Sequence, residues 1–101
     1  MTVLPKISAL TFRTGDVLYE CDDFAEEVFF ISTGEFQVLS KEGKCFSTYK
    51  DGDTIGAIEV LYDLRRIGTA ICTIDTCLYS LDHVTYLQIN STYPQLLIEV
   101  K

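Results

Sequence analysis

The sequence of 101 residues is short of the side chains that metal sites and many catalytic centres need. It has a single histidine, His83, and none of its four cysteines belongs to a C-x-x-C pair. A zinc site or a metal-binding barrel of the cupin type is therefore not expected. His83 stands beside Asp82 at an expected helix start, and no Ser, Cys or carboxylate pair has the spacing of an activated nucleophile. We expect no metal, no catalytic residue and no enzyme activity.

Basic residues are also scarce, since 8 Lys and Arg stand against 15 Asp and Glu, which gives a formal net charge of −7. This balance excludes a nucleic-acid surface and an anionic membrane surface as partners. These 101 residues contain no apolar run long enough to cross a bilayer and no signal-peptide pattern, so we expect no membrane insertion. A small anion could still bind in a locally basic pocket, because charges more than about 10 Å away are screened.

What the sequence does contain is enough apolar material for one globular domain over residues 1–101. Hydrophobic residues make up 48% of the chain, which excludes a disordered protein. The four cysteines stand mostly among strand-forming residues, where Cys is usually a small buried hydrophobe rather than a disulfide partner. Free thiols favour a cytoplasmic protein.

Short segments rich in β-branched and aromatic residues alternate with turn signals along most of the chain. This pattern predicts a mainly β fold, either an antiparallel barrel or a jelly roll. Turns are expected at residues 33–35 and 75–76. Asp82 can cap a helix over residues 84–90, and Pro94 can start a last helix with Leu96, Leu97 and Val100 on its apolar face. The expected strands are residues 8–13, 17–19, 28–32, 36–40, 45–49, 69–73 and 77–81.

Residues 51–70 (DGDTIGAIEVLYDLRRIGTA) combine glycine turns, a short helical segment and the arginine pair Arg65–Arg66. Glycine allows close approach of the backbone, a helix start offers free N–H groups, and an arginine adds a planar charged fork. Together these features indicate a pocket for one phosphate. The alternative from the residues alone is an ordinary set of β-protein turns with a solvated arginine pair.

Four segments in this order resemble the cyclic nucleotide-binding domain family. They are residues 12–16 (FRTGD), 28–38 (VFFISTGEFQV), 51–56 (DGDTIG) and 64–70 (LRRIGTA). The family includes regulatory subunits of cAMP-dependent kinase, cyclic nucleotide-gated and hyperpolarisation-activated channels, and catabolite activator proteins. The resemblance covers about residues 10–97. It implies an eight-stranded antiparallel jelly-roll barrel, in which a phosphate-binding cassette between two strands contains a short cassette helix. C-terminal helices are expected to follow the barrel. The last of them would be a mobile lid over the base, and it is truncated here.

The resemblance also implies which residues bind the ligand. Arg66 matches the arginine that pairs with the cyclic phosphate. The start of the cassette helix supplies N–H groups, and small residues after the arginine contact phosphate or base. The ligand would be cAMP or, as second choice, cGMP, with no other cofactor. The implied ligand-binding residues are Gly56, Ala57, Ile58, Arg66, Ile67, Gly68 and Thr69.

Two departures from the family pattern affect these expectations. Ala57 stands where the family has a Glu that binds the ribose hydroxyl, and losing such a bond costs about 1.5–3 kcal/mol. Glu59 lies about 200° further round a helix and is not expected to replace it. Ile67 lacks the hydroxyl of the Thr that would bind guanine, so selectivity should favour cAMP.

Two functions follow as hypotheses. In the first, the chain is a regulatory cAMP-leaning domain that controls a covalently attached channel, transporter or kinase in a longer protein. Its place would be the cytoplasm, including the cytosolic part of a membrane protein. In the second, the chain keeps the fold, has lost the nucleotide and acts as a structural or interaction module. Ala57 and the short lid favour the second hypothesis.

Overall fold

The computed structural model describes residues 7–92, which form six strands and two short helices. The expected lead-in over residues 1–6 and the last helix from Pro94 lie outside these residues. In chain order the elements are β1 (Ile7–Phe12), β2 (Val17–Tyr19), β3 (Glu27–Leu39), β4 (Cys45–Lys50), β5 (Thr54–Ile55), α1 (Ala57–Leu61), β6 (Thr69–Asp82) and α2 (His83–Thr92).

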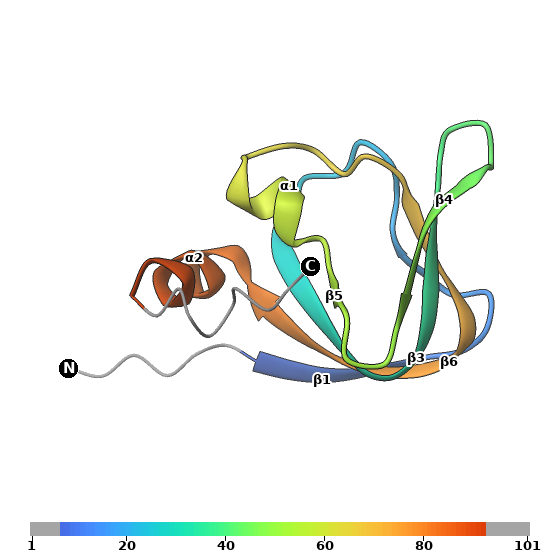
Figure 1. Cartoon of the computed structure of the whole chain (residues 1–101), viewed down its shortest axis with the longest axis horizontal. Coiled ribbons are helices and arrows are strands. Elements are labelled where there is room, and N and C mark those ends of the chain that lie inside the picture. The colour runs from blue at the N-terminus through green and yellow to red at the C-terminus, as the bar shows by residue number, and fades with distance from the viewer. Residues whose placement is uncertain (1–6, 93–101) are drawn as a thin grey trace.

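All strand pairs are antiparallel and form one sheet in the order β1-β6-β3-β4, in which β2 also pairs with β6 and β5 with β3. β3 and β6 are the long central strands, and both curve so that β4 and β5 fold back over the sheet (Figure 1). The predicted mainly β, antiparallel fold is confirmed. α1 lies at the open side of the curled sheet and α2 at one end of it (Figure 1).

The described residues form six strands, whereas the resemblance implies eight; two predicted turns lie inside long strands, and β5 was not predicted. Residues 33–35 belong to β3, where the pairing with β6 shifts register around Thr33 and Glu35. Gly34 has φ +128°, and a Cβ there would lie 2.1 Å from Thr76 Oγ1. The glycine therefore serves a bulge where the two strands touch, and the chain continues in the same direction.

The second predicted turn, at Asp75–Thr76, lies inside β6 opposite the same bulge. The Thr76 hydroxyl donates to the carbonyl of Ile74 at 2.6 Å and accepts from the N–H of Glu35 at 3.0 Å. These local bonds satisfy the backbone at the irregularity, so β6 bends without ending. Polar residues that suggested a turn thus mark a bend shared by two strands.

Two clusters of buried side chains hold the domain together. The larger fills the curl of the sheet, and within it Phe12 packs edge to face on Phe36 with ring centroids 5.5 Å apart. The smaller cluster joins α1 and α2 to the sheet and consists of Val28, Ala57, Val60, Leu81 and Tyr86. Packing of Ala57 and Val60 in this cluster fixes the position of α1. A helix of only one and a half turns would not be stable alone.

The predicted helix after Asp82 is confirmed as α2. The Asp82 carboxylate accepts from the N–H of Thr85 at 2.7 Å, as an N-cap residue does. Within residues 7–92, no helix is long and apolar enough to span a membrane. The four cysteines are all free, as expected.

Candidate functional site

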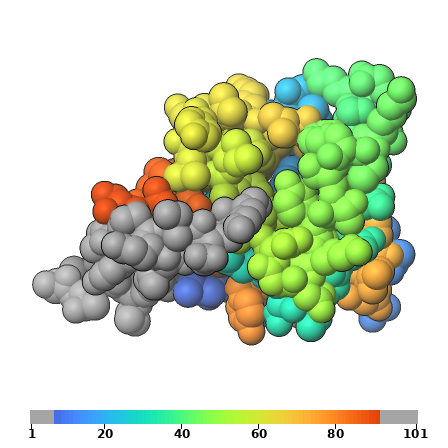
Figure 2. All heavy atoms as spheres, viewed as in Figure 1, coloured from blue at the N-terminus to red at the C-terminus, as the bar shows by residue number. Residues whose placement is uncertain are grey.

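The candidate site is formed by the segment that links β5 to β6, which we call the cassette (residues 56–66). Gly56 begins it with φ +85°, and α1 follows at once. Asp63 has φ +54° and reverses the chain, and the N–H of Leu64 then donates to the carbonyl of Glu59 at 2.8 Å. This reversal brings Arg66 back beneath the start of α1. In the space-filling view, α1 and the turn after it form part of the molecular surface (Figure 2).

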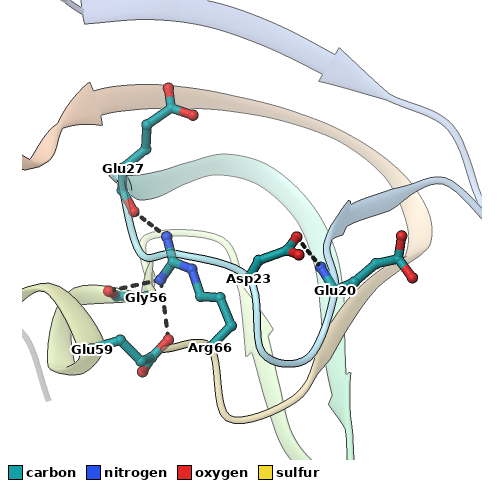
Figure 3. A network of polar contacts seen from close by, with 6 residues as sticks. All are labelled: Glu20, Asp23, Glu27, Gly56, Glu59 and Arg66. Atoms are coloured by element: carbon teal, nitrogen blue, oxygen red, sulfur yellow. Dashed lines mark hydrogen bonds and ion pairs between the residues drawn. The ribbon is translucent and has the colours of Figure 1, made fainter. Parts of the chain in front are cut away.

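Arg66 points inward and its side chain is buried, with 2% of its surface exposed. Nη1 donates to the carbonyl of Gly56 at 3.0 Å and to Oε1 of Glu59 at 3.1 Å. Nη2 donates to the carbonyl of Glu27. Figure 3 shows these three bonds converging on one side of the guanidinium. Glu59 is itself 6% exposed, so the two residues form a buried ion pair.

The other edge of the guanidinium, on which Nε lies, makes no hydrogen bond that involves Nε within the described residues. Nε is buried, and among the described residues it has no hydrogen-bond partner. An arginine has five N–H donors, so Nε–H and one N–H of Nη2 remain available. Two parallel N–H groups of this kind bind two oxygens of a phosphate or carboxylate. We call this side of Arg66 the Nε edge.

Aromatic rings complete the surroundings of Arg66. The Tyr19 ring lies 4.3 Å and the Phe29 ring 5.8 Å from its Cζ atom. Burial raises the pKa of the Tyr19 hydroxyl well above its ordinary value, and the negative charge of Glu59 raises this pKa further while Arg66 lowers it. The cluster therefore lies in a low-dielectric environment, where each charge acts strongly on its neighbours.

The backbone of Arg66 is hydrogen-bonded to the segment before β3, residues 20–26, which we call the acidic segment. Its N–H donates to the carbonyl of Asp23 at 2.8 Å, and its carbonyl accepts from the N–H of Asp22 at 2.9 Å. In the same segment the Asp23 carboxylate is bound to the N–H of Glu20 at 3.0 Å (Figure 3). These bonds hold the acidic segment against the cassette.

The structure places the two adjacent arginines in different environments. Arg65 is exposed, stacks on the Phe24 ring at 4.2 Å and donates to the carbonyl of Asp22 at 3.2 Å. Arg66 is the one that faces the interior. The fold thus brings the predicted phosphate-binding arginine to a buried position next to Gly56.

Gly56 lies directly against the side chain of Arg66. A Cβ at this position would lie 2.2 Å from Nη1 of Arg66. The group that approaches the Gly56 backbone is therefore the guanidinium of the chain itself. This contact and the positive φ both require glycine here.

The other predicted site residues lie along the same segment but have different surroundings. Ala57 is buried, whereas Ile58 and Ile67 are 60% and 55% exposed. Gly68 packs on β3, where an added Cβ would lie 2.6 Å from the Leu39 carbonyl oxygen. The Thr69 hydroxyl accepts from the N–H of Cys21 at 3.1 Å.

Sequence reasoning missed two side chains that contact Arg66. Glu59 was considered only as a replacement for the missing ribose ligand, and its pairing with Arg66 depends on the chain reversal at Asp63. Tyr19 lies almost fifty residues earlier in the chain, in a strand with no polar signature. An acid inside a short, otherwise apolar helix was the one available signal.

The curled antiparallel sheet, the cassette and its buried arginine define a cyclic nucleotide-binding type of domain. A model of the cyclic nucleotide-binding domain family matches residues 9–93. The chain belongs to this family. No curated protein sequence gives a significant match to the chain.

Solved structures share the fold at low sequence identity. A regulatory subunit of a cAMP-independent protein kinase A from Trypanosoma brucei superposes with a TM-score of 0.80 at 18% identity, over 90% of this chain and 35% of that one. The cAMP-bound PfPKA-R (141–441) gives 0.76 at 20% identity, over 82% and 31%. The sensor domain of the transcriptional regulator DNR from Pseudomonas aeruginosa gives 0.77 at 13% identity, over 82% and 61%. The chain thus spans about a third of the two kinase subunits.

Proposed function

We propose that this chain is a regulatory domain that binds a cyclic nucleotide, with the cyclic phosphate on the Nε edge of Arg66. The observation that carries the proposal is the buried Nε–H, which finds no acceptor within residues 7–92. A buried donor without a partner costs about 1–3 kcal/mol, so an anion bound there would gain this energy. The ligand-contacting set we propose is Gly56, Ala57, Ile58, Arg66, Ile67, Gly68 and Thr69.

Because Nε is buried, a ligand would reach it only after the residues around it move, and we propose that the cassette and the acidic segment separate to allow this. Binding would then select an open arrangement of these two segments over the closed one. α1 shares its buried cluster with α2, so a displaced cassette would alter the contacts of the C-terminal helix. This gives a physical route from the ligand to a domain that follows in the chain.

We further propose that the ligand is cAMP rather than cGMP, because Ile67 has no hydroxyl to bind guanine. The controlled partner would be a covalently attached channel, transporter or kinase, and the domain itself would be non-catalytic and located in the cytoplasm. Support comes from the family and from the short span of this chain relative to the two kinase subunits.

A second function is favoured by one specific contact. Glu59 already neutralises Arg66, and Ala57 cannot bind a ribose hydroxyl. A domain with these features could keep its fold without any nucleotide and serve as a structural or interaction module.

Titration with fluorescent cAMP distinguishes the two functions. Arg66→Lys keeps the positive charge and loses Nε and the planar fork, so the proposal predicts that affinity falls by about tenfold or more. Arg65→Lys makes the same chemical change on the exposed neighbour and should leave affinity within about twofold of the wild type. Equal affinity of wild type and Arg66→Lys would contradict binding of the phosphate to the Nε edge, and no binding at millimolar cAMP would favour the second function.

A further inference from the structure

We infer that Glu59 is an internal competitor of the anionic ligand: its carboxylate holds the Arg66 guanidinium in the closed state and lowers the affinity of the site. The inference rests on the proposed function, since it assumes that an anion binds to Arg66. The observation behind it is the ion pair at 3.1 Å between two side chains that are 2% and 6% exposed.

The balance of charge explains why Glu59 opposes a ligand. Arg66 carries one positive charge, and Glu59 already supplies one negative charge in direct contact with it. A phosphate on the Nε edge would place a second negative charge on the same guanidinium. Because the site is buried, water and salt screen the repulsion between the carboxylate and the phosphate only weakly.

Other groups share the positioning of Arg66 with Glu59. The carbonyls of Gly56 and Glu27 accept from Nη1 and Nη2, and the Tyr19 ring covers the guanidinium. An uncharged side chain of the same size at position 59 would leave these contacts intact. Glu59→Gln does this, because its amide oxygen can still accept from Nη1.

The test measures affinity for cAMP and for adenosine by isothermal titration calorimetry. We expect Glu59→Gln to bind cAMP about tenfold or more tightly than the wild type, because the repelling charge is gone. Adenosine carries no phosphate, so its affinity should not respond to the substitution. Asp63→Asn is the matched control: Asp63 is exposed, and Asn tolerates its positive φ of 54° while removing the same charge from the cassette.

Equal or weaker cAMP binding by Glu59→Gln would overturn the inference and leave Glu59 as a positioning residue for Arg66. Binding by Glu59→Gln but not by the wild type would support the inference and contradict the proposed function of the natural chain. Absence of cAMP binding in both proteins would overturn both.

Glu59→Ala provides a second test that is independent of how well the Gln variant folds. Inorganic phosphate should raise its melting temperature above that in chloride of equal ionic strength, more than it does for the wild type, and an equal rise would overturn the inference.

Discussion

Two adjacent arginines in this domain have opposite environments for a simple geometric reason. Arg65 forms an isolated antiparallel bridge with Phe24, and in β-type backbone successive side chains point to opposite sides. Arg65 faces outward onto the Phe24 ring, and Arg66 faces the interior. The buried position is stable only because Gly56, Glu27 and Glu59 supply acceptors, since an unpaired buried charge is strongly unfavourable.

Gly56 is the residue whose replacement should disturb Arg66 most directly. Gly56→Ala introduces strain at φ +85° and places a Cβ 2.2 Å from Nη1. We expect the strain to cost roughly 1–2 kcal/mol. Displacement of the guanidinium should add about 1–3 kcal/mol of lost hydrogen bonding. Urea unfolding followed by circular dichroism measures the sum.

Gly43→Ala separates the two contributions. Gly43 has nearly the same φ, +84°, and a Cβ there would have nothing within 4 Å. This control should show the backbone strain alone. Equal losses of stability in Gly56→Ala and Gly43→Ala would mean that contact with Arg66 does not contribute to the requirement for glycine.

At the scale of elements, the turn between β1 and β2 is attached to the middle of β6 by one carboxylate. The N–H and the hydroxyl of Thr14 donate to Asp75 Oδ1 at 2.8 and 3.1 Å. These hydrogen bonds, the backbone one first, lower the pKa of the Asp75 carboxyl below its ordinary value. The bend of β6 therefore carries a polar contact that depends on the ionised form.

This contact predicts a pH dependence of stability with a definite sign. Because the folded-state pKa is lowered, the ionised Asp75 stabilises the fold at neutral pH, and this contribution disappears as pH falls below roughly 4 through the folded-state pKa. The stability difference between wild type and Asp75→Asn should thus be constant near pH 7 and shrink toward pH 3. Urea midpoints measured across this range test it.

Glu42→Gln controls for the general loss of one acid, because Glu42 lies at the exposed tip of the β3–β4 turn. A stability difference for Asp75→Asn that stays the same from pH 7 to pH 3 would contradict the assignment of the stabilising role to the charged carboxylate.

The elements show how far the sequence determined the fold. Alternating apolar residues and glycine turns correctly indicated an antiparallel β domain, and Asp82 correctly marked the start of α2. The strand ends predicted near Gly34 and Thr76 were wrong. A glycine next to polar residues occurs in the sequence both where a turn reverses the chain and where a bulge bends two paired strands. Only the pairing of β3 with β6 distinguishes the two cases.

The candidate site, like the fold, was predictable only in part, because the sequence does not show which distant residues come together. The sequence placed Gly56 and Arg66 in one predicted phosphate pocket, and in the structure Nη1 of Arg66 lies 3.0 Å from the carbonyl oxygen of Gly56. The pairing of Glu59 with Arg66 was not predictable, because helix geometry gives the direction of Glu59 but not the path of the chain after α1. The reversal at Asp63, which has φ +54°, sets that path.

In the whole molecule, the buried Arg66 is linked through the cassette to both α2 and the sheet. Val60 of the cassette belongs to the same buried cluster as Tyr86 of α2, and the Arg66 guanidinium donates to the carbonyl of Glu27, the first residue of β3. A ligand that opens the cassette would therefore change contacts on both the sheet and α2. In a chain with net charge −7, this single inward-facing guanidinium is what makes an anionic ligand physically reasonable.

The most direct test of this account is the ¹⁵N NMR signal of Arg66 Nε–H during a titration with cAMP, assigned by its absence in Arg66→Lys. The account predicts that cAMP shifts this signal in a saturable manner, that adenosine does not, and that the Arg65 Nε signal stays unchanged under both ligands. An Arg66 Nε signal that is unmoved by millimolar cAMP would contradict the central claim that this edge of the guanidinium receives the phosphate.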